Sequence, residues 1–144
     1  MILIGCDHGG YELGREVAKH LEEKGLEYKV YGSEKGESVD YPDVAKEVCT
    51  RLLAGEGEKA ILICGTGIGI SIAANKIKGM RAALCGDCYS AKYTRLHNDA
   101  NALCMGGRVT GAGLALEIVD TFLSTGFEGG RHQRRIDKIA ELEA

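Results

Sequence analysis

The sequence lacks tryptophan, has a single proline, Pro42, and contains no apolar run long enough to cross a bilayer. Its longest apolar runs, residues 1–4 and 60–64, are far shorter than the roughly 20 residues that a membrane-spanning helix needs. No basic stretch precedes the first run, so a secretion signal is not indicated. We therefore expect a soluble, untargeted, cytoplasmic protein that does not bind membranes.

The sequence also lacks an excess of either charge. It has 18 Lys and Arg residues against 21 Asp and Glu residues, which gives a net charge of −3 at pH 7. This balance provides no general attraction to nucleic acid or to anionic lipid. We expect neither as a partner, whereas a small anionic ligand is compatible with this charge.

The composition is that of one globular domain. The chain has 144 residues, of which 44% are hydrophobic and 27% charged, and this is enough for a core without disulfides or metals. Its six cysteines lie mostly in apolar runs, and we expect them to be reduced thiols. The 21 glycines are about twice the usual share and indicate many tight or close-approach backbone positions. We predict a single domain over residues 1–144.

Predicted strands and helices alternate along the chain. Residues 1–4 and 60–64 lack polar alternation, which is typical of parallel strands covered by helices on both faces. Residues 26–31, 81–85 and 101–105 are further strand candidates. Helical spacing and end signals predict helices over residues 13–21, 42–52, 70–77, 89–96, 113–124 and 131–143.

This alternation predicts an α/β fold with right-handed crossovers. We expect a Rossmann-like three-layer α/β/α sandwich with a five-stranded parallel sheet and an extra C-terminal helix. Ligands of such sheets bind beyond the carboxyl ends of the strands. The loops that follow the predicted strands are therefore where a site is expected.

The third predicted strand ends in Cys64-Gly65-Thr66-Gly67-Ile68-Gly69, just before a helix. The glycines allow several backbone N–H groups to point into one small space, which is typical of an anion-binding loop. A thiol beside a helix N-terminus is favoured as the thiolate, which can act as base or nucleophile. A glycine turn that serves packing only, and an inert core cysteine, are the structural alternatives.

A dinucleotide-binding module is the second interpretation of this loop. The dinucleotide fingerprint needs G-x-G-x-x-G after a strand, with an acidic residue roughly 20 positions on. Asp87 lies at a tolerable distance, but the third glycine, Gly69, comes one residue early. The chain also has little room for a separate substrate domain.

Other chemistry-bearing residues cluster in three short segments. Residues 6–10 (CDHGG) end the first predicted strand, and residues 97–99 (HND) end the fourth helix, where we expect an acid or base at the same edge. Residues 129–135 (GGRHQRR) open the last helix with Arg131 and Arg135 on one face, where they could hold phosphate. A capping aspartate, a helix-terminal histidine and a solvated charged face are the structural alternatives.

No metal-ligand cluster is evident from the spacing. Cys85 and Cys88 form a C-x-x-C pair, but no second pair lies at zinc spacing and no thioredoxin-like context surrounds it. We expect no metal site.

Five segments in this order resemble the ribose-5-phosphate isomerase B family, also called the RpiB/LacAB sugar-phosphate isomerases. They are residues 6–10 (CDHGG), 40–42 (DYP), 63–76 (ICGTGIGISIAANK), 97–99 (HND) and 129–133 (GGRHQ). The resemblance covers essentially the whole chain. It implies interconversion of a phosphorylated aldose and ketose through an enediolate, without metal or organic cofactor.

The resemblance also implies a role for each segment. Cys64 corresponds to the base, and His97 to the acid that helps to open the sugar ring. One branch of the family instead uses a glutamate where this chain has Ile70, so Cys64 is the only base that the loop offers. The developing negative charge would be held by Thr66 and by the amides of Gly65, Gly67, Ile68 and Gly69.

The remaining implied roles concern substrate contacts. Asp7 and Asn98 correspond to residues that contact sugar hydroxyls, and Tyr41 to a residue that lines the pocket. The phosphate contacts would be His8, Arg108, Arg131 and Arg135.

The resemblance leaves the sugar and the assembly open. We expect ribose 5-phosphate, a substrate of the pentose phosphate pathway, with allose 6-phosphate or another hexose 6-phosphate as the alternative. A non-catalytic sugar-phosphate sensor is an alternative from another class. Because the family's C-terminal segment reaches the neighbouring subunit, we expect a homodimer or a tetramer with shared sites.

Overall fold

The computed structural model describes residues 1–143, in which strands and helices alternate as the sequence predicts. Within this range the strands are β1 (Ile2–Cys6), β2 (Tyr28–Gly32), β3 (Lys59–Cys64), β4 (Ala82–Leu84) and β5 (Ala102–Gly106). The helices are α1 (Tyr11–Glu23), α2 (Tyr41–Leu53), α3 (Ile68–Asn75), α4 (Cys88–Asn98), α5 (Ala112–Ser124) and α6 (Arg131–Glu141).

The five strands form one parallel sheet in the order β2-β1-β3-β5-β4. From β1 the chain moves outward to β2 and then returns to the other side of β1 to form β3. The carboxyl ends of β1 and β3 therefore flank the point at which the strand order reverses, where open α/β sheets bind their ligands.

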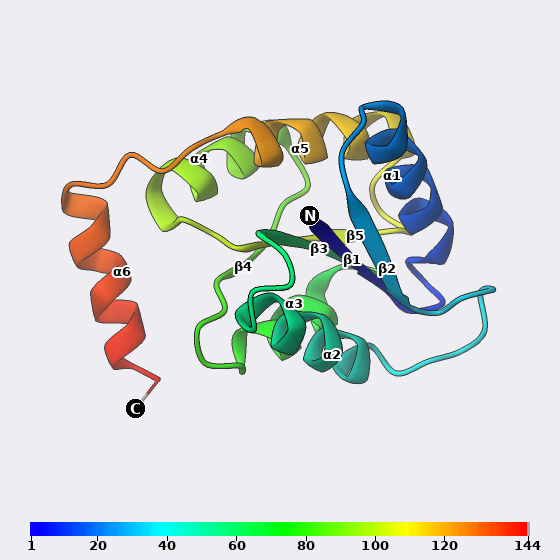
Figure 1. Cartoon of the computed structure of the whole chain (residues 1–144), viewed down its shortest axis with the longest axis horizontal. Coiled ribbons are helices and arrows are strands. Elements are labelled where there is room, and N and C mark those ends of the chain that lie inside the picture. The colour runs from blue at the N-terminus through cyan, green and yellow to red at the C-terminus, as the bar shows by residue number, and fades with distance from the viewer. Residues whose placement is uncertain (144) are drawn as a thin grey trace.

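Helices cover both faces of the sheet, which confirms the predicted three layers (Figure 1). Ile2 and Ile4 of β1 point into a core shared with α1, α4 and α5. Leu3, between them, points into the opposite core against α2 and α3. Because successive strand residues face opposite sides, an uninterrupted apolar run is what a strand covered on both faces requires.

The two edge strands differ from the central ones. The alternation over residues 26–31 marks β2, but Val30 in this strand is 46% exposed, because an edge strand is covered less completely. At the other edge, the Asn75 side chain bonds both backbone groups of Ala82 in β4. Asn75 Nδ2 donates to the Ala82 carbonyl at 2.9 Å, and the Ala82 N–H donates to Asn75 Oδ1 at 2.8 Å.

The predicted C-terminal helix, α6, stands at the β4 side of the molecule, next to α4 (Figure 1). His132 and Ile136 are its buried residues, while Arg131 and Arg135 are exposed. Beyond the helix, the Glu143 carboxylate accepts the Gly79 N–H at 3.1 Å. Of the helices within residues 1–143, none combines the length and apolar composition needed to cross a membrane.

Candidate active site

The loops after β1 and β3 meet at the reversal of the strand order. The Asp7 N–H donates to the Ile63 carbonyl at 3.2 Å, which ties the start of one loop to the other strand. A Cβ on Gly9 would lie only 2.8 Å from the Gly65 nitrogen. The two loops therefore touch through backbone alone, and glycine at position 9 is what permits this approach.

Cys64 is the last residue of β3 and is almost completely buried, with 4% of its surface exposed. Its Sγ accepts the Gly67 N–H at 3.2 Å. The next turn is closed by Thr66, whose Oγ1 accepts the Ile68 N–H at 3.2 Å. The expected base therefore has a backbone N–H donor directed at its sulfur.

Gly67 gives this loop its shape. Its φ of +80° lies in the left-handed region, which favours glycine, and a Cβ there would approach the Met105 carbonyl carbon to 2.7 Å. This conformation directs its N–H toward Cys64 Sγ and starts α3 at Ile68.

Asp7 and His8 occupy the loop after β1. Asp7 is 5% exposed, and its Oδ1 accepts the N–H groups of Gly9 and Gly10 at 2.9 and 3.0 Å. His8 is exposed, and its Nδ1 lies 3.4 Å from the Val39 N–H, which donates to it. Since Nδ1 accepts, the hydrogen of the neutral ring lies on Nε2, which is left to donate to a ligand.

Tyr41 and Arg108 also reach this glycine loop. A Cβ on Gly69 would lie 2.6 Å from Tyr41 Cζ, so the ring packs directly over this glycine. The Arg108 N–H donates to the Gly65 carbonyl at 3.0 Å, and its guanidinium Nη1 would lie 3.4 Å from a Cβ on Gly65. Three loops, those after β1, β3 and β5, thus bring an acid, a thiol and a cation to one edge of the sheet.

The expected position of His97 and Asn98 at this same edge is wrong. Both lie in the last turn of α4, and the Asn98 carbonyl accepts from Arg81 Nε at 2.9 Å. Arg81 directly precedes β4, so this contact marks the edge where the strands begin. A helix that joins two parallel strands returns the chain to that edge, opposite the end of β3 where Cys64 lies.

The helix that carries His97 and the Cys64 side chain are also on opposite faces of the sheet. α4 packs into the core that it shares with α1 and α5, whereas the Cys64 side chain belongs to the core on the α2 and α3 side. Arg131 and Arg135 lie on α6, the helix that contacts α4. One chain therefore presents two groups of predicted residues, one around Cys64 and one around His97.

Two residues near His97 were not predicted as site residues, His132 and Glu128. The His132 ring stacks on His97, with ring centroids 4.1 Å apart and an angle of 12° between the planes. Glu128 Oε2 lies 3.2 Å from His132 Nε2 and 3.8 Å from His97 Nε2. His132 is within the quoted GGRHQ segment, but its pairing with a residue 35 positions earlier has no local sequence signal.

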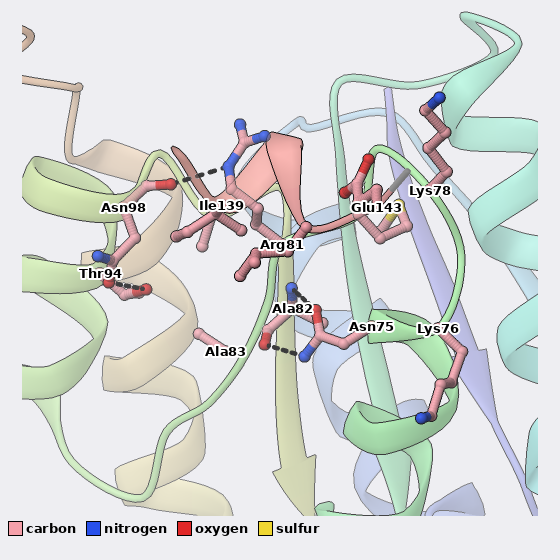
Figure 2. Close-up of a pocket in the computed structure, with 13 residues that line it drawn as sticks. Asn75, Lys76, Lys78, Arg81, Ala82, Ala83, Thr94, Asn98, Ile139 and Glu143 are labelled. Atoms are coloured by element: carbon pink, nitrogen blue, oxygen red, sulfur yellow. Dashed lines mark hydrogen bonds between the residues drawn. The ribbon is translucent and has the colours of Figure 1, made fainter. Parts of the chain in front are cut away.

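A cavity of about 530 Å³ opens at the edge of the sheet where the strands begin, between β4 and α6 (Figure 2). Asn98 and Arg81 line it together with Ile139 and Glu143. Lys76 and Lys78 point to different sides rather than toward one another (Figure 2). Since its charged groups do not converge on a common point, the loops around Cys64 are the better candidate for the reaction site.

Comparison with known proteins agrees with this geometry. A model of the ribose/galactose isomerase family matches residues 2–139. Ribose-5-phosphate isomerase B of Escherichia coli is 49% identical over 142 residues, which cover 99% of this chain and 95% of that protein. D-erythrulose-4-phosphate isomerase of Pectobacterium atrosepticum is 41% identical over 143 residues, which cover 99% of this chain and 94% of that protein.

A solved structure shares the fold at similar identity. Ribose-5-phosphate isomerase B of Clostridium thermocellum superimposes with a TM-score of 0.97 at 54% identity, covering 99% of this chain and 96% of that one. The relatives, the family match and the five-stranded parallel sheet agree. The chain belongs to the ribose/galactose isomerase family, the sugar-phosphate isomerases that include ribose-5-phosphate isomerase B.

Proposed function

We propose that this protein interconverts ribose 5-phosphate and ribulose 5-phosphate, with Cys64 as the catalytic base. The observation that carries this proposal is the Gly67 N–H directed at Cys64 Sγ in a loop that touches the Asp7 loop. Moving a proton between neighbouring carbons needs a base, and donors aimed at the oxygen where negative charge develops. The loop from Gly65 to Gly69 can supply both.

The reaction moves the proton on C2 to C1 and the proton of the C2 hydroxyl to the oxygen on C1. The Cys64 thiolate takes the proton from C2 of the open-chain aldose, which leaves an enediolate. Thr66 and the loop amides hold the negative charge on the enediolate oxygen. Return of the proton to C1, together with transfer of the C2 hydroxyl proton to O1, gives the ketose, so the step balances without a metal or redox cofactor.

Asp7 fits the binding of a sugar hydroxyl. Both of its backbone bonds fall on Oδ1, so the carboxylate is fixed in orientation while Oδ2 remains to accept from a ligand. His8 would donate to the phosphate through Nε2, with Arg108 beside the same loop as a second contact. Fixed donors and acceptors of this kind orient a flexible substrate for reaction.

We infer that the complete site needs two chains. His97, which would protonate the ring oxygen of the cyclic sugar, is at the wrong edge and on the wrong face to reach Cys64 of its own chain. A second copy would supply His97 and Asn98, together with Arg131 and Arg135 for the phosphate. This gives a homodimer, or a tetramer built from such dimers.

The proposed function is tested by an isomerisation assay against a panel of aldose phosphates. We expect ribose 5-phosphate to have the highest kcat/KM, and we expect activity to be unchanged after treatment with a chelator. Loss of activity with chelator and its recovery with a divalent ion would contradict the metal-free mechanism. Saturable binding of the sugar phosphate without turnover would instead identify a sensor.

The panel also decides between related substrates. The relative named D-erythrulose-4-phosphate isomerase makes a four-carbon sugar phosphate a specific alternative, and allose 6-phosphate is the six-carbon alternative. A higher kcat/KM for either one would replace ribose 5-phosphate as the substrate. The proposed base and loop would be unaffected by that result.

A further inference from the structure

We propose that Glu128 and His132 are positioning residues that hold the His97 ring for its role in opening the sugar ring. This inference rests on the proposed function, because it takes His97 as the acid. Neither residue has been given a role above. Glu128 lies in the segment that leads into α6, and His132 lies in the first turn of this helix. The start of α6 would thus support His97 as well as present Arg131 and Arg135 to the phosphate.

The two residues contact His97 from two directions. His132 covers one face of the His97 ring, with centroids 4.1 Å apart and nearly parallel planes. Glu128 faces the Nε2 edge, where its Oε2 lies 3.8 Å from His97 Nε2 and 3.2 Å from His132 Nε2. One carboxylate oxygen therefore faces the same nitrogen of both rings.

The supporting residues are themselves fixed. The His132 side chain is only 7% exposed, whereas the His97 side chain is 38% exposed. The Glu128 N–H donates to the Leu96 carbonyl at 3.1 Å, which anchors its backbone to the last turn of α4. A buried ring and an anchored carboxylate thus surround a histidine that is open to a ligand.

Tyr93 completes the arrangement from the other side. It lies one helical turn before His97, and the edge-to-face contact of the two rings has centroids 5.1 Å apart at 72°. Tyr89, a further turn back, stacks on Tyr93 at 4.4 Å. The His97 ring therefore lies between an aromatic stack on α4 and His132 on α6, which restricts its rotation.

A metal centre is the other use that these side chains suggest. His97, Glu128 and His132 offer ligand atoms that all lie within 4.8 Å of one another. A metal ion lies in the plane of each imidazole that binds it, and two stacked rings only 12° from parallel do not share such a point. The geometry therefore favours support of one ring by the other over shared coordination.

Substrate chemistry provides a sharp test. Ribose 5-phosphate is mainly a closed ring that must be opened, whereas erythrose 4-phosphate cannot form a furanose because its C4 oxygen carries the phosphate. Loss of the ring-opening acid therefore slows only the first substrate. A damaged Cys64 loop or a general folding defect slows both.

The experiment compares Glu128→Gln, His132→Ala and His132→Phe with the control Glu141→Gln, which changes an exposed glutamate at the far end of the helix that carries His132. We expect kcat for ribose 5-phosphate to fall about 10- to 100-fold in Glu128→Gln and His132→Ala, as expected when a reacting group is misplaced. KM and the turnover of erythrose 4-phosphate should change little. His132→Phe, which keeps a flat ring, should recover part of the loss.

Equal losses on both substrates, or unchanged kcat with only a lower Tm, would overturn the positioning role. If the wild-type protein does not turn over erythrose 4-phosphate, the NMR signals of the His97 ring test the positioning role instead. They should move in Glu128→Gln and His132→Ala as the ring loses its fixed orientation, and unchanged signals would contradict the proposal. A wild-type protein inactive on ribose 5-phosphate would refute the proposed function instead.

Discussion

Burial suppresses the chemistry of four cysteines, Cys6, Cys49, Cys85 and Cys104. Burial raises the pKa of Cys6 to about 12, with the Asp7 carboxylate adding to the effect, and it raises the pKa values of Cys49 and Cys85 to about 11. Burial also raises the pKa of Cys104. These four thiols stay protonated at neutral pH, which leaves them inert as bases or nucleophiles.

The raised pKa values predict a loss of stability in alkali. In the unfolded chain these thiols ionise near 9.0, while in the folded chain they hold their protons to about 11 or 12. The folded state therefore binds more protons above pH 9, and the free energy of unfolding should fall as the pH rises from 9 toward 12. Urea unfolding at a series of pH values measures the slope of the free energy of unfolding against pH.

A matched variant separates the thiols from other groups that titrate in alkali. Cys6→Ala removes one buried thiol, so its alkaline slope should be smaller than that of wild type, whatever its stability at neutral pH. Identical slopes in the two proteins would show that this cysteine does not titrate as described.

The proposed base makes a different prediction. Cys64→Ala should lower kcat about 10²- to 10⁴-fold, the usual contribution of a general base. Binding of the substrate phosphate should survive, because its contacts lie elsewhere. Cys85→Ala is the matched control and should keep activity near wild type, as should Cys88→Ala. Full activity in Cys64→Ala would remove the proposed base.

Among the elements, β4 has an edge that is completed by a single side chain. Both backbone groups of Ala82 are bonded by the Asn75 amide, which takes the place of a neighbouring strand at this edge. Asn75→Ala should lower the free energy of unfolding by about 0.5–1.5 kcal/mol, because both bonds are exposed and water replaces the amide in the variant. Lys76→Ala, at the next and exposed position, should change it by less than about 0.5 kcal/mol in urea titrations. Equal effects would show that the amide bonds add nothing.

The elements also show what the sequence can and cannot predict. Apolar runs and helix end signals identified every strand and helix within residues 1–143, because local periodicity reports burial directly. They also placed Cys64 and Asp7 at strand ends that meet. The prediction for His97 is wrong because the residues of its motif do not report the direction of α4, and a helix between parallel strands has to run back to the edge where the strands begin.

Other contacts had no signal in the sequence. The stacked rings of His97 and His132 join α4 to α6. Their proximity depends on the path of the segment between α5 and α6. Predicting that Asn75 completes the edge of β4 would likewise require knowing that β4 is an edge strand. Tertiary proximity of this kind is not encoded in local periodicity.

For the whole molecule, the separation of Cys64 from His97 predicts complementation between damaged chains. Homo-oligomers of Cys64→Ala and of His97→Ala should each be weak. A mixed dimer would contain one pocket with both residues intact and one with neither. Equal mixing and exchange should therefore restore about a quarter of wild-type activity, as half the dimers then hold one working pocket of two. Verified mixed dimers as weak as their parents, or an active monomer, would refute the shared site.

The position of His97 at the edge opposite Cys64 also bears on when a chain begins to work. With the proposed two-chain site, a newly synthesised chain that has folded completely would still lack half of the site, and folding alone would not produce an active enzyme. Activity would then begin only when two chains meet, and the specific activity of a pure sample would fall on dilution below the dissociation constant of the pair. The amount of catalyst in a cell would thus depend on the local concentration of the protein as well as on the number of chains made.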